Sequence, residues 1–264
     1  MPTVEFNFQD LSHLSGKEFK PHELKDRISM LGTDLEEISS ESVIMEVFPD
    51  RPDLLSVEGF SRALEGAIGI KTGLKDYNVR DSGMKLFVES SVKKIRPFVV
   101  SGVIRDVSIT DENLVSLMDI QEKLHITHGR NRKKVAIGVH DLSRIEPPFT
   151  YKAVKPNELR FMPLDMHEEL TPAEILRRHP KGIAYAWVLE GLDRYPIILD
   201  RNDNVLSFPP IINGELTRVS SSTKDLFIEI TGMDQRAINQ ALNILVTSIA
   251  DRGGDIQFVE ILTR

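Results

Sequence analysis

The chain contains no cysteine among its 264 residues, which excludes disulfide bonds, thiolate nucleophiles and cysteine-based zinc sites. It also lacks any apolar run near the roughly 18 to 20 residues that a membrane span requires. Residues 1–6 do not show the basic and then apolar pattern of a secretory signal. We therefore expect a cytoplasmic protein with no membrane segment.

Charge is distributed unevenly along the chain. Residues 1–80 carry 9 Lys and Arg against 15 Asp and Glu, whereas residues 81–264 carry 24 against 25. Residues 71–92 are rich in Gly, Asn and Asp, which interrupt periodic patterns, so they are the expected linker. Together these features predict a small module over 1–80 and a larger domain over 81–264. A nearly neutral body binds nucleic acid only through local basic clusters.

Hydrophobic periodicity predicts strands and helices that do not alternate regularly. Helices are expected to begin at Pro21, Ser56, Asp111, Thr171 and Asp234, because these residues are typical of helix starts. Strands are expected at 4–8, 43–47, 98–107, 134–139, 197–199, 205–208, 226–230 and 256–261. Because there is no steady β-α-β order, the predicted class is α+β. It comprises a small N-terminal α+β module and a larger mixed-sheet domain with flanking helices.

Common catalytic motifs are missing. The sequence has no Gly-x-Ser-x-Gly elbow, Walker loop or dinucleotide fingerprint. His125, His128, His140 and Asp141 do not have the spacing of a metal site, so no metal is expected. Asp141 is expected to cap a turn, and His140 to anchor the end of a strand.

The segment 128–134 has four Lys and Arg and no acidic residue. Such a segment can contact phosphates, or it can be a solvated turn before a strand, and composition alone favours the turn. Lys93, Lys94 and Arg96 form a second small cluster of cations.

Residues 205–214 are the most unusual stretch, because Pro209 and Pro210 interrupt an apolar strand. Such an interruption exposes backbone groups and suits the wall of a pocket. Further on, Glu229 lies within the apolar strand 226–230. Alternation permits Glu229 to face solvent, but an inward-facing carboxyl group needs a partner or a polar ligand. Both orientations remain open from the pattern.

Seven segments in order resemble the β subunit of phenylalanyl-tRNA synthetase, in its archaeal and eukaryotic form. They lie at 1–4, 50–59 (DRPDLLSVEG), 135–141 (VAIGVHD), 148–151, 195–198, 207–214 (SFPPIING) and 227–232 (FIEITG). The resemblance implies an N-terminal fragment with a B1-like module and a B3/4 editing domain. It implies no cofactor here, because ATP and magnesium belong to the catalytic α subunit, which the fragment would meet through the missing C-terminal part.

The resemblance further implies that this fragment hydrolyses tRNA(Phe) mischarged with tyrosine. An apolar pocket rejects an isostere with one extra hydroxyl only by about a hundredfold, so a second site is useful. We expect Glu229 to read the tyrosine hydroxyl, with Asn213 and Ser207 as the catalytic residues that orient water or the carbonyl. The rest of the amino-acid site is expected from Ile198, Pro209, Pro210 and Gly214.

The expected chemistry is attack by a positioned water without a covalent intermediate. The acceptor end of the tRNA is expected to contact Arg130, Arg132, Lys133 and Lys134, with help from Lys93, Lys94 and Arg96. Two other interpretations remain: a non-catalytic module for tRNA binding or assembly, and a metal-dependent hydrolase.

Overall fold

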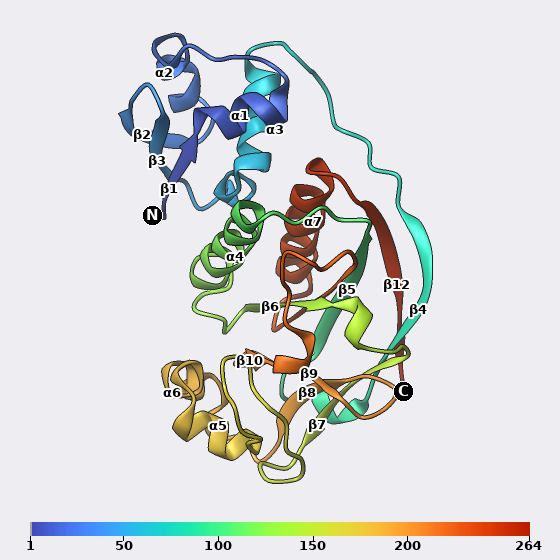
Figure 1. The fold of residues 1–264 in the computed structure, drawn as a ribbon. Coiled ribbons are helices and arrows are strands. Elements are labelled where there is room, and N and C mark those ends of the chain that lie inside the picture. Colours follow the sequence, from blue (N-terminus) through green and yellow to red (C-terminus); the bar gives the residue numbers. More distant parts are fainter. Residues whose placement is uncertain (1) are drawn as a thin grey trace.

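The computed structural model describes residues 2–264 and contains two sheets joined by a long connection (Figure 1). The first sheet is antiparallel, in the order β1-β3-β2, and belongs to the N-terminal module. Its strands are β1 (Thr3–Asn7), β2 (Thr33–Ile38) and β3 (Ser42–Val47). Within the described residues, no helix has the length and apolar character needed to cross a bilayer.

The N-terminal module has more helix than the sequence predicts. Its helical segments are α1 (Phe8–Ser15), α2 (Pro21–Ser29), η1 (Pro52–Leu55) and α3 (Val57–Ala67). The strand predicted over 4–8 ends at Asn7, because the Asn7 side chain accepts a hydrogen bond from the Gln9 N–H and starts α1. The helix predicted after Ser56 is confirmed, and the Ser56 hydroxyl caps it at the Gly59 N–H.

The expected linker over 71–92 is partly wrong. Residues 71–79 form no helix or strand, but β4 (Arg80–Val88) pairs in parallel with two strands of the second sheet. Gly83, which suggested a break, has a φ of 69° where the register with the neighbouring strand shifts. A glycine within a strand can therefore mark an irregularity instead of an end.

The second sheet has nine strands, in the order β10-β9-β8-β7-β4-β12-β5-β11-β6. β4 runs parallel to β7 and β12, and the other neighbours are antiparallel. This mixed sheet confirms the predicted α+β class. The remaining strands are β5 (Phe98–Arg105), β6 (Val135–Asp141), β7 (Phe149–Val154), β8 (Tyr195–Leu199), β9 (Val205–Phe208), β10 (Ile212–Asn213), β11 (Leu226–Gly232) and β12 (Asp255–Thr263).

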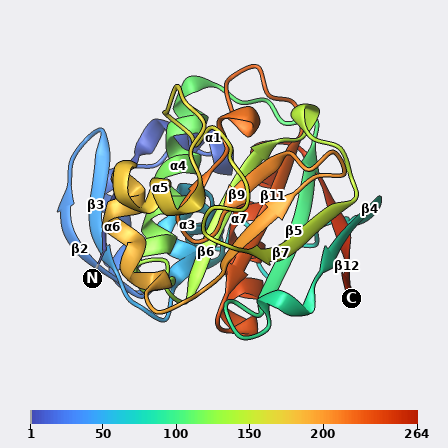
Figure 2. The same cartoon turned by 90° about the horizontal axis from the view of Figure 1, so that it is seen from below.

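Four helices flank this sheet: α4 (Asp111–Ile126), α5 (Pro172–Arg178), α6 (Pro180–Tyr185) and α7 (Gln235–Asp251). Asp234 caps α7 and Thr171 forms the predicted capping box with Glu174, whereas Thr110 caps α4 in place of the predicted Asp111. Short 3-10 turns lie at Ser90–Val92 (η2), Leu142–Arg144 (η3), Ala186–Leu189 (η4) and Glu215–Thr217 (η5). Seen along the long axis, α4, α5 and α6 lie on one side, and β4 and β12 on the other (Figure 2).

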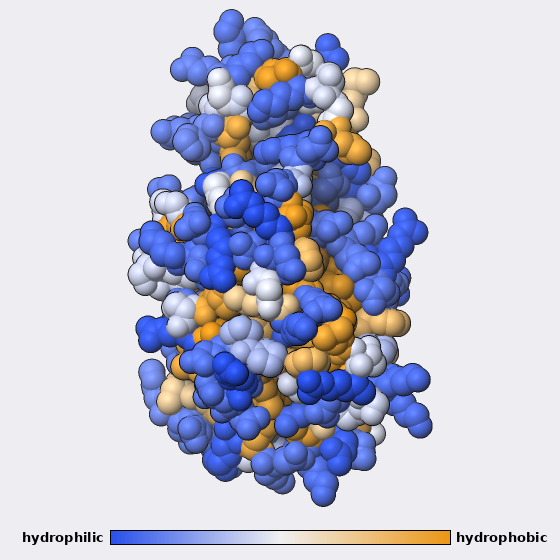
Figure 3. Space-filling model, turned by 90° about the vertical axis from the view of Figure 1, so that its right-hand side faces the viewer, coloured by the Kyte–Doolittle hydropathy of each residue, from blue (hydrophilic) through white to orange (hydrophobic). Residues whose placement is uncertain are grey.

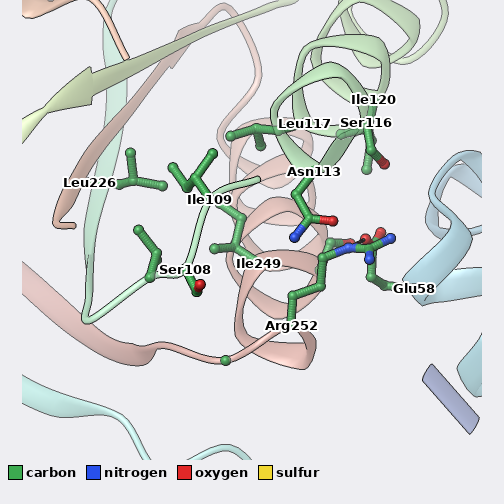
Figure 4. A pocket seen from close by; sticks show the side chains of 13 residues that line it. Glu58, Ser108, Ile109, Asn113, Ser116, Leu117, Ile120, Leu226, Ile249 and Arg252 are labelled. Atoms are coloured by element: carbon green, nitrogen blue, oxygen red, sulfur yellow. Dashed lines mark hydrogen bonds and ion pairs between the residues drawn. The ribbon is translucent and has the colours of Figure 1, made fainter. Parts of the chain in front are cut away.

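The N-terminal module packs against the helices of the second sheet. Buried residues of α3, α4 and α7 belong to one hydrophobic cluster that continues into the N-terminal sheet. At this interface Arg252 forms ion pairs with Asp10 and Glu58. Arg252 and Glu58 line a small hollow of about 40 Å³ (Figure 4). The boundary near residue 80 stays a prediction, since the two parts share this core.

The opposite side of the molecule leaves part of the sheet uncovered. Figure 3 shows apolar side chains reaching the surface on the side where β4 and β12 lie. Phe258 and Ile261 of β12 are the large exposed apolar residues of these two strands. Single exposed apolar residues are normal on a protein surface, so we assign them no role.

Candidate active site

A cavity of about 300 Å³ lies between the edge strand β6, helix α4 and the turn that follows β9. Glu229 of β11 lines it, and the start of α6 contributes His179 and Lys181. Of the predicted site residues, the cavity brings together Ser207, Pro209, Pro210, Asn213, Glu229 and Arg132. Residues 207–213 and Glu229 thus lie close to Arg132, which belongs to the basic segment 128–134 and is far away in the sequence.

Glu229 faces inward, and the solvent-facing alternative is wrong. β11 lies between β5 and β6, and all seven of its residues are buried, with Glu229 only 2% exposed. Alternation therefore cannot send its side chain to water. The Ser207 hydroxyl donates to Glu229 Oε1 at 2.8 Å, whereas Glu229 Oε2 has no hydrogen-bond partner in the protein. A buried carboxyl oxygen without a partner is costly unless a ligand supplies a donor.

His140 of the neighbouring strand β6 is fully buried and lies beside Glu229. Its Nδ1 lies 2.8 Å from the Thr217 hydroxyl, which itself donates to the Gly214 carbonyl at 3.1 Å. The hydroxyl oxygen is therefore free to accept a hydrogen bond from Nδ1–H. That Nε2 lies 3.8 Å from Glu229 Oε1 and has no hydrogen-bond partner in the protein. The predicted anchoring role of His140 misses this second contact with Glu229.

Gly138 makes room for this pair of side chains. It lies opposite Glu229 in the β6–β11 ladder. A Cβ atom built on Gly138 meets His140 Nε2 at 2.7 Å and Glu229 Cδ at 2.9 Å. Both distances are shorter than a normal van der Waals contact, so any side chain at this position displaces the carboxyl group or the imidazole.

The proline turn forms one wall, as predicted. The Ile211 N–H donates to the Phe208 carbonyl at 2.7 Å across Pro209 and Pro210, so β9 ends there. Asn213 lies two residues after Ile211. Its Nδ2 donates to the carbonyl of Val139, on the edge strand β6, at 3.3 Å. This bond leaves the Asn213 Oδ1 as the acceptor that the side chain presents.

Two of the residues expected in the amino-acid site lie outside the cavity. Ile198 is fully buried in a core cluster with Tyr151 and Phe227, so its predicted contact with a substrate ring is wrong. Gly214 lines a neighbouring groove instead of the cavity. A Cβ atom on Gly214 meets the Val205 carbonyl at 2.6 Å, so close backbone packing explains the glycine.

The facing wall comes from α4, which sequence reasoning missed. Gln121 Nε2 donates to the Ile137 carbonyl at 2.9 Å, and His125 Nε2 accepts from the Ile137 N–H at 2.7 Å. These side chains satisfy backbone groups that an edge strand leaves unpaired. Burial lowers the pKa of His125 to about 4, so this imidazole is neutral at pH 7.

Arg132 is a wall residue and not the exposed cation that was expected. It is 7% exposed, donates to the Ile211 carbonyl at 2.9 Å and pairs with Glu122 at 2.8 Å. Its guanidinium also lies 4.6 Å from the centre of the Tyr185 ring. These contacts hold the proline turn to α4 and α6.

The other predicted tRNA contacts differ in exposure. Arg130 and Lys133 are exposed, whereas Lys134 is half-buried and pairs with Asp234 at 3.1 Å. Arg96 is only 2% exposed and donates to the Thr231 hydroxyl and to three backbone carbonyls, including those of Arg132 and Lys133. Its expected contact with RNA is therefore wrong. Arg96 ties the basic segment to the sheet.

Asp141 caps η3 as predicted, because its Oδ1 accepts from the Ser143 N–H at 2.9 Å. Across residues 2–264, no three side chains of the His, Asp or Glu type gather as they would around a metal ion.

The comparisons with known proteins agree on one family. Residues 103–255 match the model of the B3/4 domain, and every residue that lines the cavity lies within this range. Phenylalanine–tRNA ligase β subunits from Methanosarcina barkeri and Archaeoglobus fulgidus are 48% and 50% identical over 262 residues. Each alignment covers 99% of this chain and 47% of the relative, so the chain spans about half the length of these relatives.

A solved structure gives the same result. The crystal structure of an N-terminal fragment of the phenylalanyl-tRNA synthetase β subunit from Pyrococcus horikoshii superposes with a TM-score of 0.93. It is 36% identical, and the match covers 100% of this chain and 77% of that fragment. The chain therefore belongs to the phenylalanine–tRNA ligase β-subunit family and contains a B3/4 domain.

Proposed function

We propose that the cavity hydrolyses the ester bond of tRNA(Phe) mischarged with tyrosine. One observation carries this proposal: Glu229 lines the cavity, and its buried Oε2 is an acceptor without a hydrogen-bond partner in the protein. A phenol O–H is a donor that fits such an acceptor. When phenylalanine enters, this acceptor stays unpaired, so the site discriminates against the correct product by the missing hydrogen bond.

The turn after β9 supplies the groups that surround the ester. In our proposal Asn213 Oδ1 accepts a hydrogen bond from the attacking water and so orients it toward the ester carbonyl. Ser207 acts indirectly, because its hydroxyl donates to Glu229 and fixes the orientation of the carboxyl group. Pro209 and Pro210 form a rigid wall against the substrate. The proposal needs no covalent intermediate, because an aminoacyl ester already reacts with a positioned water.

Exposed Arg130 and Lys133 are proposed to contact phosphates at the acceptor end of the tRNA. We assign no cofactor to this chain, and place ATP and magnesium on a catalytic α subunit that binds a part of the enzyme outside these residues. We place the assembled enzyme in the cytoplasm.

The test compares hydrolysis of Tyr-tRNA(Phe) and Phe-tRNA(Phe) by the wild-type chain and by Glu229→Ala. We expect faster release of tyrosine than of phenylalanine. Glu229→Ala should lower tyrosine release about tenfold to a hundredfold, as expected from a hydrogen bond to a charged group of about 1.5–3 kcal/mol.

Glu260→Ala, which removes an exposed carboxyl group from β12, is the matched control and should keep the wild-type rate. If the wild-type chain binds tRNA but releases neither amino acid faster than buffer, the non-catalytic alternative is correct. If chelators abolish hydrolysis, the metal-dependent alternative is favoured.

A further inference from the structure

A groove of about 100 Å³ adjoins the cavity between α4, residue 164 and the turn after β10. Met118, Gln121, Leu164 and Asn213 line both hollows, so the groove continues the cavity. The Leu164 N–H donates to the Asn213 carbonyl at 2.9 Å, which fixes the border between the two. A ligand that fills the cavity and extends past Asn213 therefore enters this groove.

The two sides of the groove are apolar. Leu114, Leu117 and Met118 come from α4, and Leu164 and Val219 come from the loops before and after the proline turn. Leu114 and Leu117 are half-buried, and Met118 is 57% exposed. Apolar walls that remain partly open to solvent suit a planar ring that stacks between them.

The polar side chains that line the groove belong to Gln121, Asn213, Thr217 and Arg218. Arg218 donates to Glu215 and Asp165, and Thr217 donates to the Gly214 carbonyl. Gln121 Nε2 donates to the Ile137 carbonyl at 2.9 Å, which leaves the amide oxygen Oε1 to accept from a ligand. Such an oxygen accepts from an amino group on a ring, whereas a ring carbonyl at the same place meets it as a second acceptor. The groove thus favours a base with an exocyclic amino group.

We propose that this groove binds the adenine of the terminal adenosine of the tRNA, which rests on the proposed function. The aminoacyl ester is carried by the ribose of that adenosine, so its base lies one sugar away from the ester. With the amino acid in the cavity and the ester beside Asn213, the base lies between α4 and Leu164. Its amino group donates to Gln121 Oε1, and its ring packs against Leu114 and Leu117.

The experiment measures binding of free adenosine and inosine to the full chain by NMR line broadening of the nucleoside. Inosine has a carbonyl in place of the amino group and a proton on N1, and we expect it to bind about tenfold more weakly. Purine riboside, which lacks the amino group and has no proton on N1, should be weakened to the same extent. Leu114→Trp fills the groove and should weaken adenosine binding about tenfold or more. Val115→Trp places the same ring on a 68% exposed position of α4 outside the groove, and should not change binding.

Equal binding of adenosine and both analogues would contradict recognition of the amino group by Gln121. An equal loss of adenosine binding in the Leu114→Trp and Val115→Trp variants would contradict the placement of the base in the groove. Val219→Trp, on the opposite wall, replaces Leu114→Trp if circular dichroism shows that the latter does not fold. Because the free nucleosides carry no ester, the binding result does not depend on hydrolysis. Loss of hydrolysis with intact adenosine binding refutes only the proposed function.

Discussion

Gly138 lies directly opposite Glu229 on the neighbouring strand, and the missing side chain leaves the space that the carboxyl group occupies. Gly138→Ala should therefore destabilise the chain by about 1–3 kcal/mol, as overpacking does, and should slow release of tyrosine. Gly102→Ala is the matched control, because a Cβ there meets its neighbours at 3.6–3.7 Å. Urea unfolding and Tyr-tRNA hydrolysis measure both effects. If the two alanine variants behave alike, the packing account of Gly138 is incorrect.

Arg96 contributes to stability from inside the protein. Arg96→Met leaves the carbonyls of Arg132, Lys133 and Thr231 without their donor, and we expect a loss of about 3 kcal/mol or more. The exposed Lys94→Met, two residues away, should change stability by less than about 0.5 kcal/mol. Guanidinium unfolding of both variants checks this difference, and similar midpoints would contradict it.

Stability should decrease as the pH falls from about 6.5 to about 4. Burial lowers the pKa of His125 to about 4, from its ordinary value of about 6.5 in the unfolded chain. Between these values the unfolded state binds a proton that the folded state does not, so protonation favours unfolding. The expected loss is about 3 kcal/mol. This loss of stability disappears above about pH 6.5, where the imidazole is mainly neutral in both states.

The pH effect is measured by urea unfolding of the wild-type chain and His125→Gln at pH 7, 6 and 5. Glutamine keeps an acceptor for the Ile137 N–H but does not titrate. His125→Gln should therefore flatten the pH dependence, and His128→Gln, which alters a half-buried histidine, is the control. A slope that survives in His125→Gln would assign the effect to another group.

Loss of Arg252 should weaken the packing of the N-terminal module against the larger domain. Arg252→Met removes the cation that pairs with Asp10 and the buried Glu58. Burial raises the pKa of Glu58, and we expect a loss of about 3–5 kcal/mol from leaving that group unpaired. Arg80→Met, which breaks an exposed pair with Asp255, should cost less than about 1 kcal/mol. Limited proteolysis should cut residues 71–79 faster only in Arg252→Met.

The basic segment should divide into two functional classes. Arg130→Ala and Lys133→Ala remove exposed cations, so each should lower the salt dependence of tRNA binding by about one unit of slope. Arg132→Ala removes the contacts with Ile211 and Glu122, and should slow hydrolysis and lower stability. Binding measured at three salt concentrations tests the first group. Unchanged slopes would place the RNA elsewhere.

Local features of the sequence were sufficient for much of the fold. The capping box at Thr171, the hairpin over 197–208 and the helix after Asp234 each depend on residues close together in the chain. Local features gave wrong predictions where one residue type is compatible with two structural roles. Asn7 ends a strand and caps a helix at once, and Gly83 interrupts β4 without ending it.

By itself the sequence determined the family, the α+β class and one wall of the cavity, from Ser207 to Asn213, because motifs and periodicity are properties of neighbouring residues. Only the tertiary structure decided that Glu229 is buried, since that depends on β11 lying between β5 and β6. The same holds for the distance of 3.8 Å between Glu229 Oε1 and His140 Nε2 and for the burial of Arg96 and Arg132. Exposure and the distance between remote side chains are set by packing, which no local pattern encodes.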